Sequence, residues 1–110
     1  MKARVPQGPS MNAMIKQAQK MQEDMAAKQA ELDEREYDVS AGGGVVTVKI
    51  NGKREILEIN LEPEIVDPDD IETLSDILVA AVNEAIKRVD ETNNAELNKI
   101  TGPMNLPGLF

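Results

Sequence analysis

The stretch AGGGVVTVKINGKREI, residues 41–56, places a run of β-branched residues between two glycine-containing segments. Val46, Val48 and Ile50 alternate with polar residues, which is the period of a strand with one apolar face. Asn-Gly at 51–52 is the dipeptide most typical of a two-residue type I′ hairpin turn. The stretch therefore predicts the central strand of an antiparallel sheet, with a turn at each end.

Alternating apolar residues continue on both sides of this central strand. The inward residues of the outer strands are Tyr37, Val39 and Ala41 upstream, and Leu57, Ile59 and Leu61 downstream. The three segments predict an antiparallel meander with one apolar and one mostly polar face. With a two-residue turn at Asn51-Gly52, the expected pairs are Ile50 with Lys53, Val48 with Glu55, and Val46 with Leu57.

The consecutive glycines Gly42, Gly43 and Gly44 raise the question of a phosphate-binding loop. The known phosphate-binding glycine motifs open a helix, whereas these glycines precede a strand, and we therefore interpret them as structural. A two-residue turn at Gly42-Gly43 keeps the inward residues of the first two strands on one face. The expected pairs are Ala41 with Gly44, Val39 with Val46, Tyr37 with Val48, and Glu36 with Lys49. Gly44 would then lie within the central strand, flanked by Ala41 and Ile59, and would admit a close neighbour.

A long helix is expected before the sheet, over about residues 11–35. Its apolar residues recur at the 3-4 spacing of a heptad seam. At ~1.5 Å per residue this helix is nearly 40 Å long, too long for one small sheet to cover. The seam therefore favours a partner helix from a second copy of the chain. It consists of Met11, Met14, Ala18, Met21, Met25 and Leu32, with Lys28 at one core-type position.

A second helix is expected after the sheet. It begins in DPDD, with Asp67 as the N-cap and Pro68 as the first helical residue, and it ends near Thr92 or continues past Asn93-Asn94. The expected buried stripe is Ile71, Leu74, Leu78, Ala81, Val82, Ala85 and Val89. Together these elements predict one α+β domain over residues 10–100, with a flexible basic leader at 1–9 and a Gly/Pro-rich tail at 101–110.

Composition narrows the classes of function. The chain has 110 residues, no Cys and no His, so the commonest general base and the thiolate metal ligands are missing. We expect no enzyme activity, no metal and no cofactor, and we interpret Asp69, Glu72 and Asp76 as a solvated acidic surface. The longest apolar run, 77–82, is far shorter than the ~20 residues that span a bilayer. Without an evident signal peptide, a cytoplasmic protein with no membrane contact is expected.

Positive charge is concentrated at the start of an acidic chain. The net charge is −8, yet residues 1–22 contain four bases, Lys2, Arg4, Lys16 and Lys20, and no acid. Lys87 and Arg88 are adjacent in the second helix. These residues could contact phosphates or could be ordinary solvated surface charges. The sequence alone favours solvated surface charges. Scarce aromatic residues argue against stacking on single strands.

Three segments and the closing LPG together resemble the YbaB/EbfC family of nucleoid-associated proteins. The segments are MIKQAQKMQEDM (14–25), AGGGVVTVKINGKREI (41–56) and LSDILVAAVNEAIKRVDE (74–91). The resemblance implies an α-β-β-β-α protomer in a tweezer-shaped homodimer that binds DNA with little or modest sequence preference. It further implies a bacterial protein that acts in nucleoid organisation or gene regulation, with no catalytic role.

The resemblance also assigns residues to these roles. The family's basic positions, early in the first helix and late in the second, match Lys16, Lys87 and Arg88. We add Lys20 by proximity, and Lys2 and Arg4 by inference from the leader. The dimer seam is expected at Met14, Ala18, Met21 and Met25, and the structural turns at Gly42, Gly43, Gly44, Asn51 and Gly52.

We therefore predict a nucleoid-associated homodimer that contacts the phosphates of double-stranded DNA and has no small-molecule substrate. The alternative is a protein–protein interaction module that uses the methionine seam or the C-terminal tail.

Overall fold

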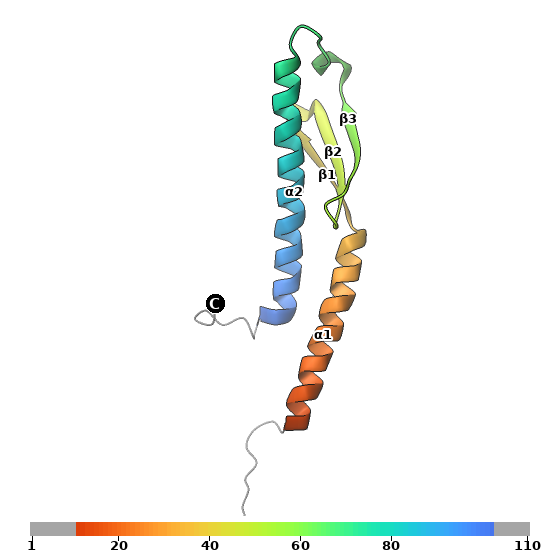
Figure 1. Cartoon of the computed structure of the whole chain (residues 1–110), viewed down its shortest axis with the longest axis vertical. Helices are drawn as coiled ribbons and strands as arrows, with labels where there is room; N and C mark the ends of the chain where they lie inside the picture. The colour runs from red at the N-terminus through yellow and green to blue at the C-terminus, as the bar shows by residue number, and fades with distance from the viewer. Residues whose placement is uncertain (1–10, 103–110) are drawn as a thin grey trace, which may run out of the picture.

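The computed structural model describes residues 11–102, which form two long helices and one three-stranded sheet (Figure 1). The elements are α1 (Met11–Glu34), β1 (Glu36–Ala41), β2 (Val46–Asn51), β3 (Ile56–Leu61) and α2 (Ile71–Thr101). The strands follow the order β1-β2-β3, and both pairs are antiparallel. The expected α-β-β-β-α protomer with a meander is thus confirmed. The leader, and the tail beyond Gly102, lie outside the described residues.

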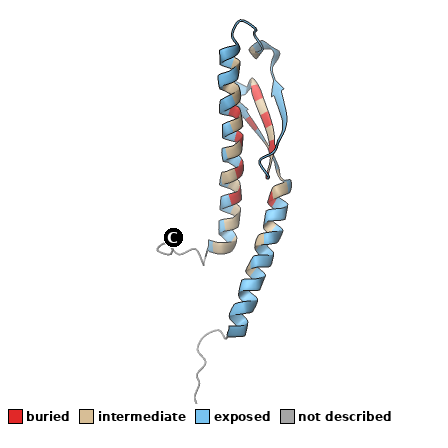
Figure 2. Ribbon diagram, viewed as in Figure 1, coloured by how far each residue is buried: buried red, intermediate tan, exposed pale blue. Residues whose placement is uncertain are grey.

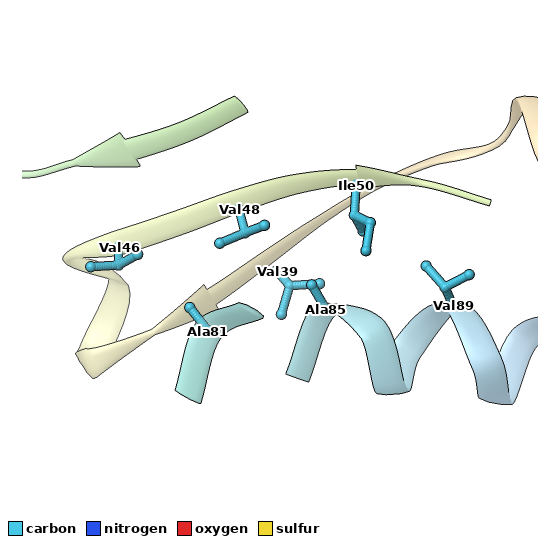
Figure 3. Packing of buried hydrophobic residues seen from close by; sticks show 7 residues of the cluster. All are labelled: Val39, Val46, Val48, Ile50, Ala81, Ala85 and Val89. Carbon is cyan, nitrogen blue, oxygen red and sulfur yellow. The ribbon is translucent and has the colours of Figure 1, made fainter. Parts of the chain in front are cut away.

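The core lies between one face of the sheet and α2 (Figures 2 and 3). Its buried residues are Val39 of β1, Val46, Val48 and Ile50 of β2, and Ala81, Ala85 and Val89 of α2. The four-residue spacing in α2 presents these three side chains on one side of the helix, and the two alanines allow it to lie close to the strands. The residues of the predicted buried stripe are buried or half-buried, with the exception of Ile71. Ile71 is 61% exposed because it is the first residue of α2.

The start of α2 differs from the prediction. Asp70, and not Asp67, is the N-cap, and its side chain accepts a hydrogen bond from the Thr73 N–H. Asp67 instead closes the turn before the helix, where its Oδ1 accepts from the Asp69 N–H and its carbonyl from the Asp70 N–H. A preceding turn with its own aspartate cap thus delays the helix by three residues.

The turn between β1 and β2 is longer than predicted. Ala41 pairs with Val46, Val39 with Val48, Tyr37 with Ile50, and Glu36 with Asn51. The connection therefore includes all three glycines and Val45. The shift is two residues, so the expected side chains still face the core.

The three glycines have φ values of +65°, +76° and +98°, a region that glycine enters without strain. Gly44 is thus a turn residue, and the expectation that it lies within the central strand is wrong. The close neighbour belongs to Gly42, where an added Cβ would lie 3.0 Å from Ile77 Cγ2.

The connection between β2 and β3 is also longer than a two-residue turn. Val46 pairs with Leu61, Val48 with Ile59, and Ile50 with Ile56, and the register shifts between Lys49 and Ile50. The Asn51 side chain organises this loop, because its Oδ1 accepts from the backbone N–H groups of Lys53 and Glu55. The positive φ of +66° is found at Arg54 and not at Gly52.

Gly52 lies in a turn, as predicted, and has a second role that was not predicted. It is buried, its N–H donates to the Arg35 carbonyl at 3.0 Å, and its own carbonyl accepts from Asn93 Nδ2 at 3.3 Å. An added Cβ would lie 1.8 Å from the Leu32 carbonyl oxygen. Gly52 therefore joins the end of α1, the sheet and α2, and the absence of a side chain is what permits this contact.

The apolar residues of β3 are not covered. Cross-strand partners share a face of a sheet, so Ile56, Ile59 and Leu61 lie on the same face as the core residues of β2. They remain 38–42% exposed, because α2 packs mainly on β1 and β2. Leu57 lies at the register shift and is 45% exposed. The expectation that Leu57, Ile59 and Leu61 form part of the core is wrong for a single protomer.

Candidate nucleic-acid interface

The N-terminal half of α1 projects past the end of α2, away from the sheet (Figure 1). All residues from 11 to 20 are exposed, as the pale blue of this segment in Figure 2 shows. The segment contains no glycine or proline and is rich in Met, Ala, Gln and Lys, which favour helix without help from packing. We refer to residues 11–22 as the arm.

The arm carries Lys16 and Lys20, one helical turn apart. Lys16 forms no ion pair within residues 11–102, and Lys20 Nζ lies 3.5 Å from Asp24 Oδ1, with the lysine side chain 76% exposed. Such an exposed pair contributes little free energy, so Lys20 can exchange Asp24 for another anion. The first acidic residue after Met11 is Glu23, and the arm is therefore a positive segment of an acidic protein.

Lys87 and Arg88 occupy a different environment. Both are exposed on α2, and the neighbouring Ala85 and Val89 face the sheet. Several acidic residues lie three or four positions away, where side chains on a helix are neighbours; these are Glu84, Asp90 and Glu91. Asp90 is engaged by Arg54 of the β2–β3 loop, which leaves two acids beside two bases. The positive potential at this pair is weaker than on the arm.

The two basic pairs do not meet within one protomer. Lys20 and Asp24 line a surface cleft together with Ile100, so the last turn of α2 lies level with Lys20. Lys87 is 13 residues before Ile100, or about 20 Å along the helix at ~1.5 Å per residue. Lys2 and Arg4 lie outside the described residues.

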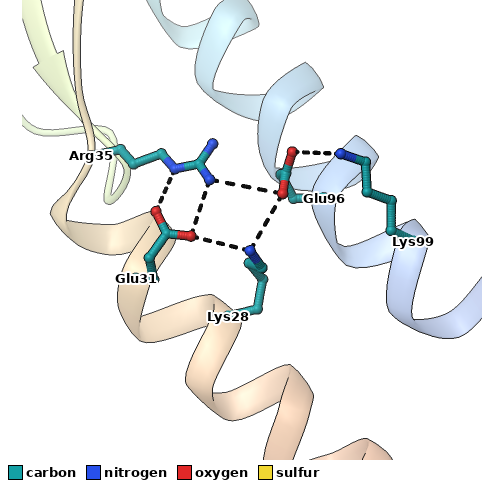
Figure 4. A network of polar contacts seen from close by, with 5 residues as sticks. All are labelled: Lys28, Glu31, Arg35, Glu96 and Lys99. Atoms are coloured by element: carbon teal, nitrogen blue, oxygen red, sulfur yellow. Dashed lines mark hydrogen bonds and ion pairs between the residues drawn. The ribbon is translucent and has the colours of Figure 1, made fainter.

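An ion-pair network joins α1 to α2 above the arm (Figure 4). Glu96 of α2 accepts from Lys28 at 3.5 Å, lies 3.8 Å from Arg35, and pairs with Lys99 at 3.0 Å. Glu31 bridges Lys28 and Arg35 on the α1 side. The network lies at the junction between the arm and the body of the protein, and it explains Lys28 at a core-type position. The network was not predicted from the sequence, although Glu31 lies three residues after Lys28 and four before Arg35.

The network holds its acidic residues in the charged form. The hydrogen bond from Arg35 lowers the pKa of Glu31 from its ordinary value, and the hydrogen bond from Lys99 lowers the pKa of Glu96. The Glu31 hydrogen bond in turn raises the pKa of Arg35. Of the two carboxylates, only Glu96 also pairs across to the α1 side, with Lys28 and Arg35, so its charged form favours the arrangement in which α1 and α2 are joined.

Acidification is expected to weaken this junction. The folded pKa of Glu96 lies below its unfolded value of about 4.3, so its contribution is complete above pH ~5 and is lost as the pH falls through the folded pKa. In urea unfolding followed by circular dichroism, Glu96→Gln should be less stable than the parent at pH 7 and should lose less stability on acidification. Glu23→Gln, outside the network, is the matched control. A Glu96→Gln variant with the full acid sensitivity of the parent would contradict the assignment.

The acidic residues at the start of α2 do not share one surface of the helix, contrary to the expectation from the sequence. Asp69 lies in the turn before the helix, so it does not share a helical face with Glu72 and Asp76. Within residues 11–102 no three acidic side chains are grouped so that they could hold a metal ion. Over the same range, neither helix combines the length and apolar character needed to cross a membrane.

The described structure thus defines a class: a small α+β protein with a lysine-bearing helical arm on an acidic body. The YbaB/EbfC DNA-binding family matches residues 7–104. A nucleoid-associated protein of Clostridium novyi is 55% identical over 94% of this chain and 90% of its own length. One of Alkaliphilus metalliredigens is 54% identical over 93% and 90%. The chain therefore belongs to the YbaB/EbfC DNA-binding family.

A solved structure has the same fold. An uncharacterized protein of Helicobacter pylori superposes with a TM-score of 0.66, covering 83% of this chain and 97% of that one. At 21% sequence identity this likeness supports the architecture only.

Proposed function

We propose that this protein binds double-stranded DNA with little sequence preference, through contacts between the arm and the phosphate backbone, at the bacterial nucleoid. The observation that carries the proposal is the exposed arm, with Lys16 and Lys20 and no acid before Glu23, in a member of a DNA-binding family. Lysine neutralises phosphates without reading base edges. The role is one of binding and not of catalysis.

The net charge of −8 is compatible with this proposal because of the arm's length. Lys16 lies seven residues before Glu23, the first acid of α1, or about 10 Å along the helix at ~1.5 Å per residue. The Debye length at 0.1 M salt is about 10 Å, so acidic residues farther along the body are largely screened at Lys16. The arm can approach a duplex while the body stays in solvent.

We further propose that two copies form a dimer through β3. This strand is at the edge of the sheet, and its apolar side chains are exposed. An uncovered apolar edge strand is a liability that a two-fold dimer removes by pairing it with itself. A dimer carries two arms, which would double the number of phosphate contacts. Met14, Ala18, Met21 and Met25 remain the alternative dimer contact predicted from the sequence.

Fluorescence anisotropy with a mixed-sequence duplex tests the DNA proposal. The logarithm of affinity should fall linearly with the logarithm of salt concentration, with about 0.9 in slope for each phosphate contact. Lys16→Ala combined with Lys20→Ala should reduce both the affinity at low salt and the slope. Lys87→Ala combined with Arg88→Ala should have a smaller effect, because Glu84 and Glu91 already offset that pair.

The matched control removes two lysines elsewhere. Lys49 lies on the outer face of the sheet between Asp38 and Glu58, and Lys53 lies in the β2–β3 loop. Their double alanine variant loses the same charge as the arm variant and should bind almost as the parent does. Equal weakening by the two double variants would assign binding to net charge and not to the arm. No binding of the parent at low salt and micromolar protein would refute the proposal.

A further inference from the structure

A groove runs along the methionine seam of α1 and ends at α2. It has a volume of about 500 Å³ and is lined by Met14, Ala18, Met21 and Met25, with Thr101 of α2 on one side. Met14 is 54% exposed, and Met21 and Met25 are half-buried. Three flexible methionines make a surface that adapts to an apolar occupant.

The chain itself supplies a segment that begins beside this groove. Thr101 is the last residue of α2, and residues 103–110 follow one residue later. These eight residues, PMNLPGLF, reach at most about 27 Å when extended. Met14 and Met25 are separated by about 16 Å along α1, so the tail is long enough to follow the whole groove.

The chemistry of this segment matches the groove. Residues 103–110 contain no charged side chain and four large apolar ones, Met104, Leu106, Leu109 and Phe110. Pro103 and Pro107 lack the backbone N–H that a regular helix uses as a hydrogen-bond donor. The side chains of this segment can therefore enter the groove without desolvating a charged side chain.

A second copy of α1 fits the same groove less well. A coiled-coil partner needs a continuous seam, but the seam is interrupted at Lys28, whose ammonium group is committed to Glu31 and Glu96. The last turn of α2 also occupies one side of the groove at Thr101. The available space suits side chains of an extended segment and not a helix with its full diameter of about 10 Å.

We propose that residues 103–110 fold back onto the methionine groove of their own chain and cover the seam of the arm. Lys16 lies two residues after Met14 and two before Ala18, on the opposite side of α1. The covered arm would therefore keep this lysine exposed while hiding its apolar side. This inference is independent of DNA binding.

A spin label on the tail tests this placement in the full chain. The sequence has no cysteine, so Gly108→Cys gives one site for a nitroxide, and methyl-labelled methionine reports on the groove. Doubly labelled chains are diluted with a large excess of unlabelled chains, so that only contacts within one chain are seen. The methyl signals of Met21 and Met25 should be lost by relaxation. A nitroxide at Glu64→Cys, at the far end of the sheet, should leave them intact.

Tail variants separate apolar docking from chance proximity. Leu106→Asp with Leu109→Asp should restore the Met21 and Met25 signals, whereas Asn105→Asp, which adds charge without removing an apolar side chain, should not. A second sample mixes nitroxide-bearing unlabelled chains with methyl-labelled chains lacking the nitroxide. Signal loss in that sample would place the tail of a second copy at the groove and would overturn the proposal. Intact signals in every sample would also overturn it.

Discussion

Replacing Gly52 by alanine is expected to destabilise the protein by about 3 kcal/mol or more, or to prevent folding. The alanine Cβ would lie 1.8 Å from the Leu32 carbonyl oxygen, 2.6 Å from its carbonyl carbon and 3.0 Å from Asp33 Cα. These are backbone atoms, which cannot move aside as the end of a side chain can. Relief requires α1 or the β2–β3 loop to shift.

A shift at Gly52 would disturb the contacts among the end of α1, the β2–β3 loop and α2. The Gly52 N–H donates to Arg35 at the end of α1, and its carbonyl accepts from Asn93 of α2. Leu32, two residues before the end of α1, is fully buried at the same place. Since total stabilities of small domains are about 5–15 kcal/mol, one substitution here removes a large share.

Urea unfolding at fixed protein concentration, followed by circular dichroism, measures this effect. Gly102→Ala is the matched control, because an added Cβ there meets no atom within 4 Å and Gly102 has a helical φ of −47°. That variant should change the free energy of unfolding by less than about 1 kcal/mol. A Gly52→Ala variant as stable as the parent would show that the contact with Leu32 is looser than described.

Gly52 also shows where sequence-based prediction of the fold reached its limit. The alternation of Val46, Val48 and Ile50 correctly predicted which side chains face the core, because strand period is a local property. The turn lengths were wrong because Gly42-Gly43 and Asn51-Gly52 were each interpreted as a two-residue turn from the local sequence alone. The contact between Gly52 and Leu32 joins residues 20 positions apart, and no local pattern contains it.

The candidate site, like the fold, was predicted from the sequence only in part. The position of Lys16 and Lys20 on an exposed helix followed from the charge distribution and the helical spacing. The acidic surroundings of Lys87 and the separation of the two basic pairs depend on how α1 and α2 pack, which sequence spacing does not determine. The exposure of Ile59 could not be predicted either. The alternation of apolar and polar residues in β3 is the same whether α2 or a second protomer covers its apolar face.

Replacing Ile59 by aspartate is expected to weaken the proposed dimer at least about a hundredfold, which corresponds to about 2.8 kcal/mol. Ile59 lies in the middle of the apolar residues of β3 and is 42% exposed in one protomer. Two-fold symmetry would place two carboxylates in one interface, where each loses its hydration and repels the other. The fold of the protomer should survive, because the substituted position is open to solvent.

Asn60→Asp provides the matched control for this substitution. It adds the same charge at the next residue of β3, on the opposite, polar face of the sheet, where Asn60 pairs with Thr47. Sedimentation velocity at micromolar concentration should show a dimer for the parent and for Asn60→Asp, and a monomer for Ile59→Asp with unchanged circular dichroism. A parent that sediments as a monomer would refute the dimer, and a dimeric Ile59→Asp would move its interface away from β3, with the methionine seam as the alternative.

DNA binding by the same variant then tests whether dimerisation and function are coupled. A monomer has one arm, so Ile59→Asp should show about half the salt slope of the parent, since the slope scales with the number of phosphate contacts. Its affinity should fall more than Lys16→Ala or Lys20→Ala alone achieves, because linking two arms makes the second contact intramolecular. A monomeric Ile59→Asp with the full slope of the parent would mean that all phosphate contacts come from one protomer, and two arms would then be unnecessary for binding.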